Sequence, residues 1–311
     1  MHLMIPFASA CAEPASPVLR DLSLPTLGRL LQRMTPVQRD EADAYSLNPP
    51  HERALAAAWG WTGEPGALPF AARAAAADGV AVSELPWGLL TPVHWQVGRE
   101  HITLADPAAL GLDAAESQAI LEAVRELFES EGFTLVWGAA GRWYAAHPSF
   151  EGLATASLDR VIGRNVDLWL QGSHQARLVR RLQNEVQMLL YNHPLNDARE
   201  ARGLRPVNSF WLSGCGRFQP QQPPDTLQVD ERLRAPLLAD DWAAWAEAWR
   251  ALDAGPLTEL LARTQRAEAV RLTLCGERSW VAYEPAVAPS LWQRLRSGFS
   301  PPDTAHILGD L

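Results

Sequence analysis

The sequence has little cysteine: three residues in 311, far apart at Cys11, Cys215 and Cys275. No C-x-x-C pair occurs, so neither a disulfide framework nor a cysteine-rich zinc site is expected. An export signal is also not expected, because the first residues, MHLMIPFASACA, contain no Lys or Arg and Pro6 interrupts a short apolar stretch. Apolar runs stay well below about 18 residues, the length that a membrane-spanning helix requires. We therefore expect a cytoplasmic protein without a membrane partner.

Basic residues are also in short supply. The 27 Lys and Arg residues stand against 36 Asp and Glu residues, which gives a net charge of −9, and no run of five or more basic residues occurs. Nucleic acid is therefore not expected as a partner, since neutralisation of phosphates supplies most of that affinity. The densest basic segment, RLVRRL at 177–182, is interpreted as the solvated face of a helix.

Common catalytic and metal-binding motifs are missing. The eight histidines form no H-x-H, H-x-x-x-H or H-E-x-x-H pattern, and no G-x-S-x-G motif is present. His94 and His101 fall on what should be facing strands, where two imidazoles could still meet. Cys215 lies between two glycines near Arg217, a setting that could lower the pKa of a thiol. The prediction is nevertheless that the chain has no cofactor, no metal ligands and no catalytic residues.

Helical and strand-like patterns alternate along the chain and predict an α/β fold. The segment 23–34 predicts a surface helix with Ser23 as its N-cap, and Asp113 with Glu116 forms a capping box before a second helix. The segment 94–107 predicts a hairpin that turns near Gly98. We predict a helix-flanked sheet formed by residues 1–85 and 151–311, with a β-β-α-β-β unit inserted at 86–150.

The most unusual stretch is LLYNHPLNDAREARGLRPVNSFWLSGCGR at 189–217, where a crowded polar turn joins a helix to an apolar strand. Two guanidinium groups spaced like Arg199 and Arg202 could bind one phosphate or carboxylate in a bidentate manner. The strand would then bring further groups to the carboxyl edge of the sheet. The alternative is a hydrogen-bonded corner, because Asn and Asp side chains bond nearby backbone in such turns. The candidate ligand-binding residues are His193, Asn196, Asp197, Arg199, Arg202, Asn208, Gly214, Gly216 and Arg217.

Three of the 13 tryptophans form one helical stripe, Trp242, Trp245 and Trp249. A stripe of this kind is typical of core packing, and the alternative is a face that binds a protein partner.

The polar stretch resembles a segment of archaeal-type cofactor-independent phosphoglycerate mutases. The matching positions are His193, Pro194, Asn196, Arg199, Gly203, Pro206, Asn208, Trp211, Gly214 and Gly216. The resemblance implies an alkaline-phosphatase-like sheet with a small α+β insertion, and in that superfamily two metal ions, a nucleophilic Ser and Asp and His ligands. The chain departs from this pattern, because its first strand, HLMIPFASA, has no Asp-Gly after it and LTLCGERSW has no Asp-His.

A closer likeness is to RpfE-type bacterial regulatory proteins, which share TPVHWQV and nearly all of LQNEVQMLLYNHPLNDAREARGLRPVNSFWLSGCGR. Together the two resemblances imply a degenerate relative of the mutases that acts as a non-catalytic regulatory or adaptor protein. Its candidate partners are a small phosphorylated or carboxylate ligand and a second protein. Two alternatives stay open at this point: a mutase or phosphatase with relocated metal ligands, and a protein–protein scaffold.

Overall fold

A computed structural model describes residues 1–170, 172–220, 227–286 and 302–311, and the chain forms two compact units. The first unit contains residues 1–44, 49–60 and 222–311, and the second contains residues 45–48 and 61–221. Both units combine a mixed or antiparallel sheet with helices, so the predicted α/β class is confirmed. In the part of the chain that is described, no helix has the length and apolar character needed to cross a bilayer.

The first unit is built on a five-stranded sheet in the order β2-β11-β10-β1-β9. Strand β1 is parallel to both β10 and β9, whereas β11 is antiparallel to β10 and to β2. The strands are β1 (His2–Ile5), β2 (Met34–Glu41), β9 (Leu227–Val229), β10 (Arg271–Cys275) and β11 (Ser279–Pro285).

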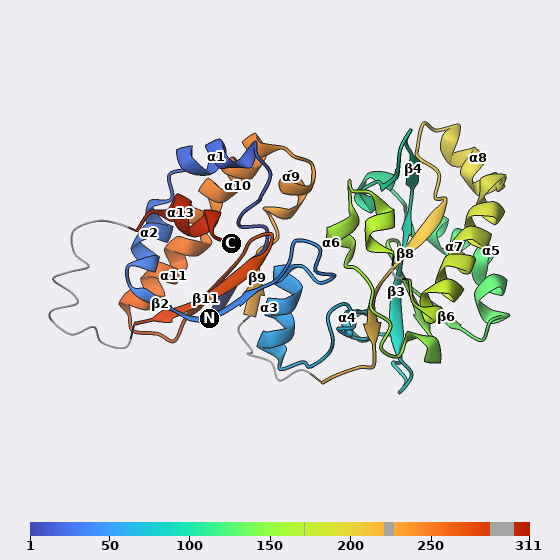
Figure 1. Cartoon of the computed structure of the whole chain (residues 1–311), viewed down its shortest axis with the longest axis horizontal. Helices are drawn as coiled ribbons and strands as arrows, with labels where there is room; N and C mark the ends of the chain where they lie inside the picture. The colour runs from blue at the N-terminus through green and yellow to red at the C-terminus, as the bar shows by residue number, and fades with distance from the viewer. Residues whose placement is uncertain (171, 221–226, 287–301) are drawn as a thin grey trace. The chain divides into compact units, whose positions relative to one another are not determined.

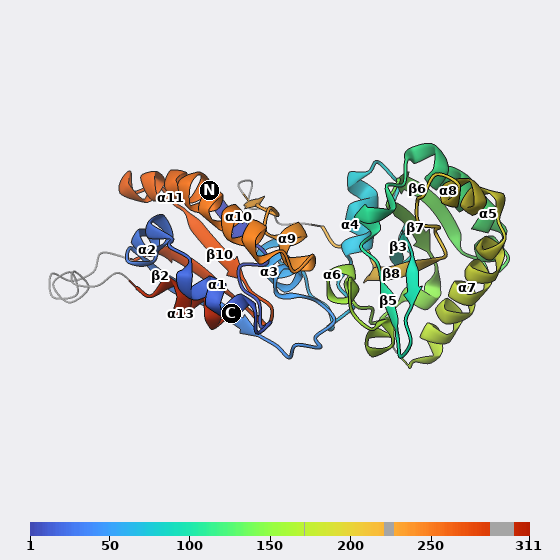
Figure 2. The same cartoon turned by 90° about the horizontal axis from the view of Figure 1, so that it is seen from above.

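Successive side chains of these strands point to opposite faces of the sheet, and the first unit therefore has two hydrophobic cores. Leu3, Ile5 and Leu272 face a large core shared with most of its helices, whereas Met4 and Cys275 face α3 (Pro50–Trp59) on the other side (Figures 1 and 2). The helices other than α3 are α1 (Ala15–Asp21), α2 (Pro25–Leu31), α9 (Arg234–Leu238), α10 (Trp242–Ala254), α11 (Pro256–Gln265) and α13 (Thr304–Gly309).

The N-terminus of α2 differs from the prediction that Ser23 caps it. The helix begins at Pro25, its N-cap residue is Leu24, and no side chain of its own caps it. Instead, the carboxylate of Asp253 on α10 accepts hydrogen bonds from the backbone N–H groups of Thr26 and Leu27. A capping group supplied by a residue more than 200 positions away cannot be read from local sequence.

The second unit has a four-stranded antiparallel sheet in the order β6-β7-β3-β8. The helices α5, α7 and α8 lie on one side of this sheet, and α4 lies on the other (Figure 1). The strands are β3 (Trp87–Val93), β6 (Thr134–Ala139), β7 (Arg142–Ala146) and β8 (Ser209–Gly216). The main helices are α4 (Phe70–Ala77), α5 (Ala114–Glu129), α6 (Leu158–Val161), α7 (His174–Tyr191) and α8 (Pro194–Glu200).

Local predictions hold in this unit, but its extent differs from the predicted insertion. A hairpin of β4 (Trp95–Val97) and β5 (Ile102–Leu104) turns at Gly98, and the Asp113 carboxylate caps α5 by accepting from the Glu116 N–H. The predicted 86–150 segment lies within the unit. The unit is larger because β8, far along the chain, completes the sheet next to β3.

Asp78, which follows α4, fixes that helix to the sheet. Its carboxylate accepts two hydrogen bonds from Arg142, each 2.8 Å long, and one of 2.6 Å from the Tyr144 hydroxyl. Hydrogen bonding to Arg142 is the main cause that holds the pKa of Asp78 below its usual value of 3.8.

Asp78→Asn is expected to reduce stability at neutral pH by about 1–2 kcal/mol and to flatten the acid limb of the stability curve. A lowered carboxyl pKa gives stability that is fully present above the unfolded-state pKa and is lost as the pH falls through the folded-state pKa. Urea unfolding of wild type and Asp78→Asn between pH 7 and about 2.5 measures the effect. Glu64→Gln, a neutralisation at an exposed position of the same unit, should leave the curve unchanged. Parallel curves for wild type and Asp78→Asn would contradict this account.

Candidate functional site

Asn196, a predicted ligand-binding residue, is a buried clamp on the backbone. Its amide nitrogen donates to the carbonyl oxygens of Leu190 and Val207, and its amide oxygen accepts from the Val207 N–H. The side chain is therefore used on both its donor and acceptor sides, and it holds the end of α7 to the start of β8. It satisfies backbone groups that no helix or strand satisfies at this corner.

Asn208 forms the same kind of clamp on the β4–β5 hairpin. Its amide oxygen accepts from the Trp95 N–H and its amide nitrogen donates to the Trp95 carbonyl, at 2.7 and 2.9 Å. His94, beside it, directs Nδ1 to the Pro206 carbonyl at 2.9 Å. The side chains of Asn196 and Asn208 thus bind backbone groups of the segments that meet at the start of β8.

Arg199 and Arg202 share a face, as predicted, but the anion that they bind is a side chain of the protein itself. Both guanidinium groups bind the Glu116 carboxylate on α5, Arg199 through Nη1 at 2.5 Å. Arg199 is 1% exposed and also donates to the carbonyl oxygens of Leu110 and Arg205. This geometry favours the hydrogen-bonded corner, because Glu116 occupies the position that an external phosphate or carboxylate would need.

The remaining charged or ionisable candidates, Arg217, His193 and Asp197, form no hydrogen bond or ion pair with Glu116 within the described residues. Arg217 follows the last residue of β8, whose eight residues span about 26 Å, and it binds Glu151 and the Glu84 carbonyl. His193 caps α8 by accepting from the Leu195 N–H, and Asp197 is exposed in the first turn of that helix. The three arginines therefore do not point into one pocket.

Gly214 and Gly216 serve the close approach of α4 to β8. Gly214 has a φ of 65°, and a Cβ atom there would lie 2.9 Å from the backbone nitrogen of Ala71. A Cβ at Gly216 would lie 3.1 Å from Cβ of Pro69. The register between β8 and β3 also shifts here, so Gly214 sits in a bulge that only a residue tolerant of positive φ fills without strain.

Cys215 lies between these glycines and points into the core. The thiol is fully buried, and burial raises its pKa to about 12. A thiol with such a pKa is protonated at neutral pH, so this position does not supply a nucleophilic thiolate. Across the described ranges, no group of three or more His, Cys, Asp or Glu side chains is arranged to hold a metal ion.

The tryptophan stripe belongs to the core of the first unit. Trp245 and Trp249 are completely buried, with their rings edge to face at 6.3 Å, and the Trp245 indole N–H donates to the Phe7 carbonyl. Trp242 is half-buried and packs edge-on against Trp245. The geometry favours the core interpretation over a partner-binding face.

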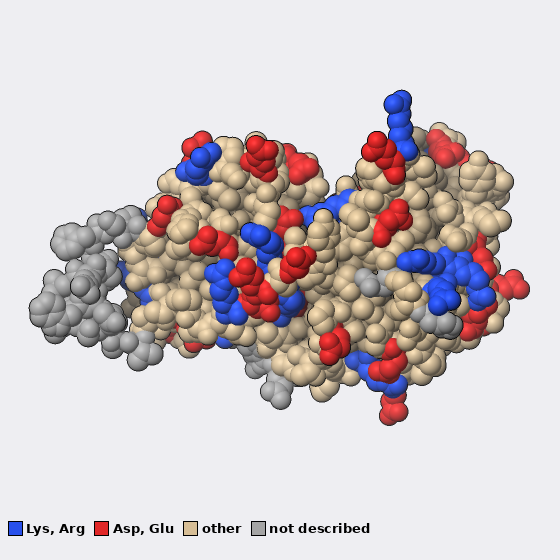
Figure 3. All heavy atoms as spheres, in the orientation of Figure 1, with Lys and Arg blue, Asp and Glu red and all other residues tan. Residues whose placement is uncertain are grey.

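The basic segment at 177–182 lies on α7, in the region where Figure 3 shows a group of basic side chains with acidic ones next to it. Arg181 is paired with Glu131 at 2.5 Å and lies 3.8 Å from Glu185. This arrangement agrees with the predicted solvated helix face.

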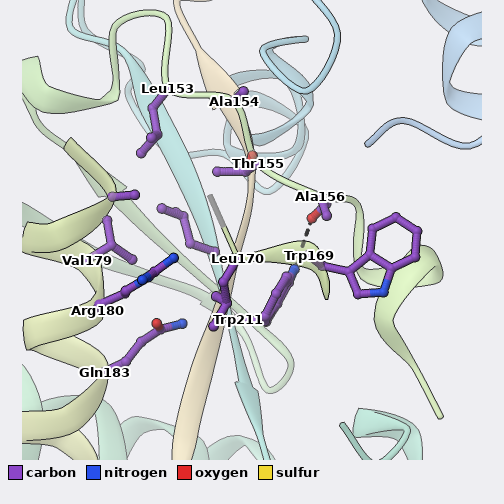
Figure 4. A pocket seen from close by; sticks show the side chains of 12 residues that line it. Leu153, Ala154, Thr155, Ala156, Trp169, Leu170, Val179, Arg180, Gln183 and Trp211 are labelled. Carbon is purple, nitrogen blue, oxygen red and sulfur yellow. Dashed lines mark hydrogen bonds between the residues drawn. The ribbon is translucent and has the colours of Figure 1, made fainter. Parts of the chain in front are cut away.

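A recess that sequence reasoning missed lies beside β8 in the second unit (Figure 4). Residues of α7, β8, the segment 153–156 and Trp169 with Leu170 form its walls. Arg180 and Gln183 extend from α7 toward it, while Trp211 closes one side and donates its indole N–H to the Ala156 carbonyl at 2.9 Å. The only advance signal was the spacing of Arg180 and Gln183, three apart on a helix, which places them on one face.

Comparison with known proteins does not identify an activity for this chain. No protein-family model matches the sequence, and a search of curated proteins found no match. Among solved structures, the cofactor-independent phosphoglycerate mutase from Thermoplasma acidophilum DSM 1728 is 12% identical, with a TM-score of 0.39, over 98% of this chain and 94% of that one. The PH0037 protein from Pyrococcus horikoshii is 11% identical, with a TM-score of 0.45, over 92% and 87%. Both likenesses are distant, and membership of the RpfE-type family stays a prediction.

Proposed function

We propose that the protein is a non-catalytic regulatory or adaptor protein whose second unit holds a small anionic ligand in the recess between α7 and β8. The observation that supports this most is the recess itself, which joins apolar walls to one cationic side chain, Arg180, and one buried amide, Gln183. Sites for small molecules are typically apolar hollows in which a few polar groups fix the orientation of the ligand.

The proposal places the anion in the recess and not at the polar corner at 193–217 for a physical reason. An external anion at Arg199 would have to displace Glu116 and leave that carboxylate, which is 16% exposed, without its two cationic partners. Separating a buried ion pair is strongly unfavourable. Arg180 lines a hollow on α7, and neither Glu116 nor Arg199 is among the residues that line this hollow.

Binding is tested by thermal shift with inorganic phosphate, 3-phosphoglycerate or butyrate, each in excess over the protein. At least one anion should raise the melting temperature of wild type and of Arg177→Gln, but not that of Arg180→Gln. Arg177 is exposed on the same helix and does not line the recess, so it controls for the loss of charge. If no anion stabilises wild type, or if both variants respond alike, the proposed site is wrong.

The non-catalytic part of the proposal is tested separately. Protein purified without chelator should contain less than one equivalent of Mn or Zn and should not convert 3-phosphoglycerate when Mn²⁺ is added. Two stoichiometric metal ions together with turnover would establish a mutase or phosphatase with relocated ligands instead.

A further inference from the structure

Helix α7 lies on the outside of the second unit (Figure 2), and its outer face carries a narrow stripe of exposed side chains. The residues of this stripe follow one another at intervals of four, three, four and three positions. They are Arg177, Arg181, Asn184, Met188 and Tyr191. We call these five residues the α7 seam. Two helices that pack side by side contact each other through residues at this spacing, so the seam has the pattern of a helix-pairing surface.

The C-terminal half of the seam is apolar. Met188 and Tyr191 are each 79% exposed, and side chains three apart on a helix lie next to each other. The core-facing side of α7 is a different set of residues, which includes Leu182, Val186 and Leu190, so the seam is not part of the core of the unit. Exposed apolar side chains that adjoin one another are typical of contact surfaces for another protein, where tyrosine and methionine are enriched.

The N-terminal half of the seam is basic, and its centre is polar. Arg177 and Arg181 occupy the first two positions, and Arg181 also pairs with Glu131. The last turn of α7 contains no basic residue. Among the described residues, the side chains of Arg177 and Asn184 have no hydrogen bond or ion pair, so both are available to a second molecule. Along the helix the seam therefore changes from positive, through neutral and polar, to apolar.

Two copies of the seam complement each other when their helices run antiparallel. Arg177 then lies opposite Tyr191 of the second copy, and Arg181 lies opposite Met188 of the second copy. A guanidinium over a tyrosine ring forms a cation–π contact, and the aliphatic stem of an arginine packs on a methionine. Asn184 meets its own counterpart on the two-fold axis, where two amides can exchange hydrogen bonds. Each half of the seam thus binds the other half, as a two-fold symmetric interface requires.

Other occupants fit the seam less well. In a parallel pair, Arg177 would lie beside Arg177 and Arg181 beside Arg181, and like charges at this distance repel each other. An antiparallel pair also places the positive end of each helix dipole next to the negative end of the other. A foreign apolar helix would cover Met188 and Tyr191, but it would leave both arginines against apolar side chains.

We infer that two copies of the chain associate through an antiparallel pair of α7 seams and form a reversible dimer. The seam extends over 15 residues, from Arg177 to Tyr191, or about 21 Å along the helix axis. A single helix pair of this length buries less than the roughly 1,200–2,000 Å² of a stable interface, so the dissociation constant should be about 10–100 µM. Among the described residues that line the recess, none belongs to the seam, so dimer formation and ligand binding are separate properties.

Sedimentation velocity of the full chain between about 1 and 200 µM tests the inference. Wild type should change from monomer to dimer over this range. Met188→Lys places an ammonium group opposite Arg181 of the second copy and should weaken the dimer about 10- to 100-fold. Val97→Lys is the matched control, because Val97 is 73% exposed on the β4–β5 hairpin of the same unit and is not part of the seam.

Met188→Glu separates antiparallel pairing from a simple apolar contact. The carboxylate would lie opposite Arg181 of the second copy, so this variant should dimerise at least about 10-fold more tightly than Met188→Lys. In a purely apolar contact, Lys and Glu at this position would weaken association equally.

Disulfide trapping tests the register of the two helices. In a Cys11→Ser background, Asn184→Cys should give a covalent dimer on mild oxidation, since the two thiols meet at the two-fold axis. Met188→Cys should not, because antiparallel helices place its two copies about 12 Å apart along the axis, beyond the roughly 7 Å between Cα atoms that a disulfide tolerates. Cys215 and Cys275 are buried and do not compete.

Three results would overturn the inference. One is a wild-type chain that stays monomeric up to about 200 µM. The second is a dimer that Met188→Lys and Tyr191→Lys leave intact, and the third is a dimer that Met188→Cys traps as readily as Asn184→Cys. The anion response in thermal shift should be the same in wild type and Met188→Lys, so failure of the dimer is distinguishable from failure of the proposed function.

Discussion

Glu116→Ala is expected to destabilise the second unit by about 3–5 kcal/mol, the usual result when one partner of a buried ion pair is removed. The substitution leaves the Arg199 guanidinium, 1% exposed, without a counter-charge between α5 and α8. Arg199→Ala should have an effect of similar size, because it removes the same pair and leaves the Leu110 and Arg205 carbonyls without their donor. Urea unfolding followed by circular dichroism measures both.

Glu122→Ala is the matched control. Glu122 lies on the same helix as Glu116 and pairs with Arg125, but its side chain is at the surface and 62% exposed. The substitution should change stability little. The same unfolding curves with and without phosphate or 3-phosphoglycerate distinguish the two interpretations of the corner. If Arg199 is structural, Arg199→Ala should lose stability and should respond to the anion as wild type does. If Arg199 binds the anion, Arg199→Ala should keep near wild-type stability and lose the response to the anion. A stable Glu116→Ala protein would contradict the structural account.

Trp245→Ala is expected to destabilise the first unit by about 3–5 kcal/mol, the range for removal of a large buried aromatic side chain. Trp245 is completely buried against Trp249, and its N–H is bound to the Phe7 carbonyl, so the substitution creates a cavity and also leaves that oxygen without a donor. Thermal and urea unfolding of the full chain measures the loss.

Trp242→Ala provides the comparison at the end of the same stripe, where the side chain is half-buried and only its edge contact with Trp245 is lost. Its effect should be clearly smaller. If Trp245→Ala keeps the stability of wild type but loses binding to a protein partner, the stripe is an interaction face and the core interpretation is wrong.

Local sequence patterns were sufficient to predict the helices and turns whose own residues show capping, apolar spacing or a turn glycine. The capping box at Asp113 and the apolar spacing behind it predicted α5, and Gly98 marked the turn of the β4–β5 hairpin. Strand β2 was missed because its sequence, MTPVQRDE, is mostly polar and exposed and shows no alternation. Its pairing with β11, far along the chain, makes it a strand.

The candidate site was likewise predicted only in part from the sequence. The sequence showed that Arg199 and Arg202 share a face and that the polar stretch is dense in hydrogen-bonding groups, because both properties depend on neighbours within one helical turn. It did not identify Glu116 as the anion they bind, since that pairing joins residues 83 positions apart.

The sequence by itself determined the α/β class, the helical faces and the buried stripe at Trp245 and Trp249, because periodicity and capping are local properties of the chain. Only the tertiary structure decided the partners of the polar side chains: the Asn196 clamp on Val207, the Asn208 clamp on Trp95 and the Asp253 cap on α2. It also decided where space is left unfilled, at the recess beside β8. The physical reason is that a hydrogen bond or a cavity depends on which segments pack together, and that packing brings together residues that no short stretch of sequence contains.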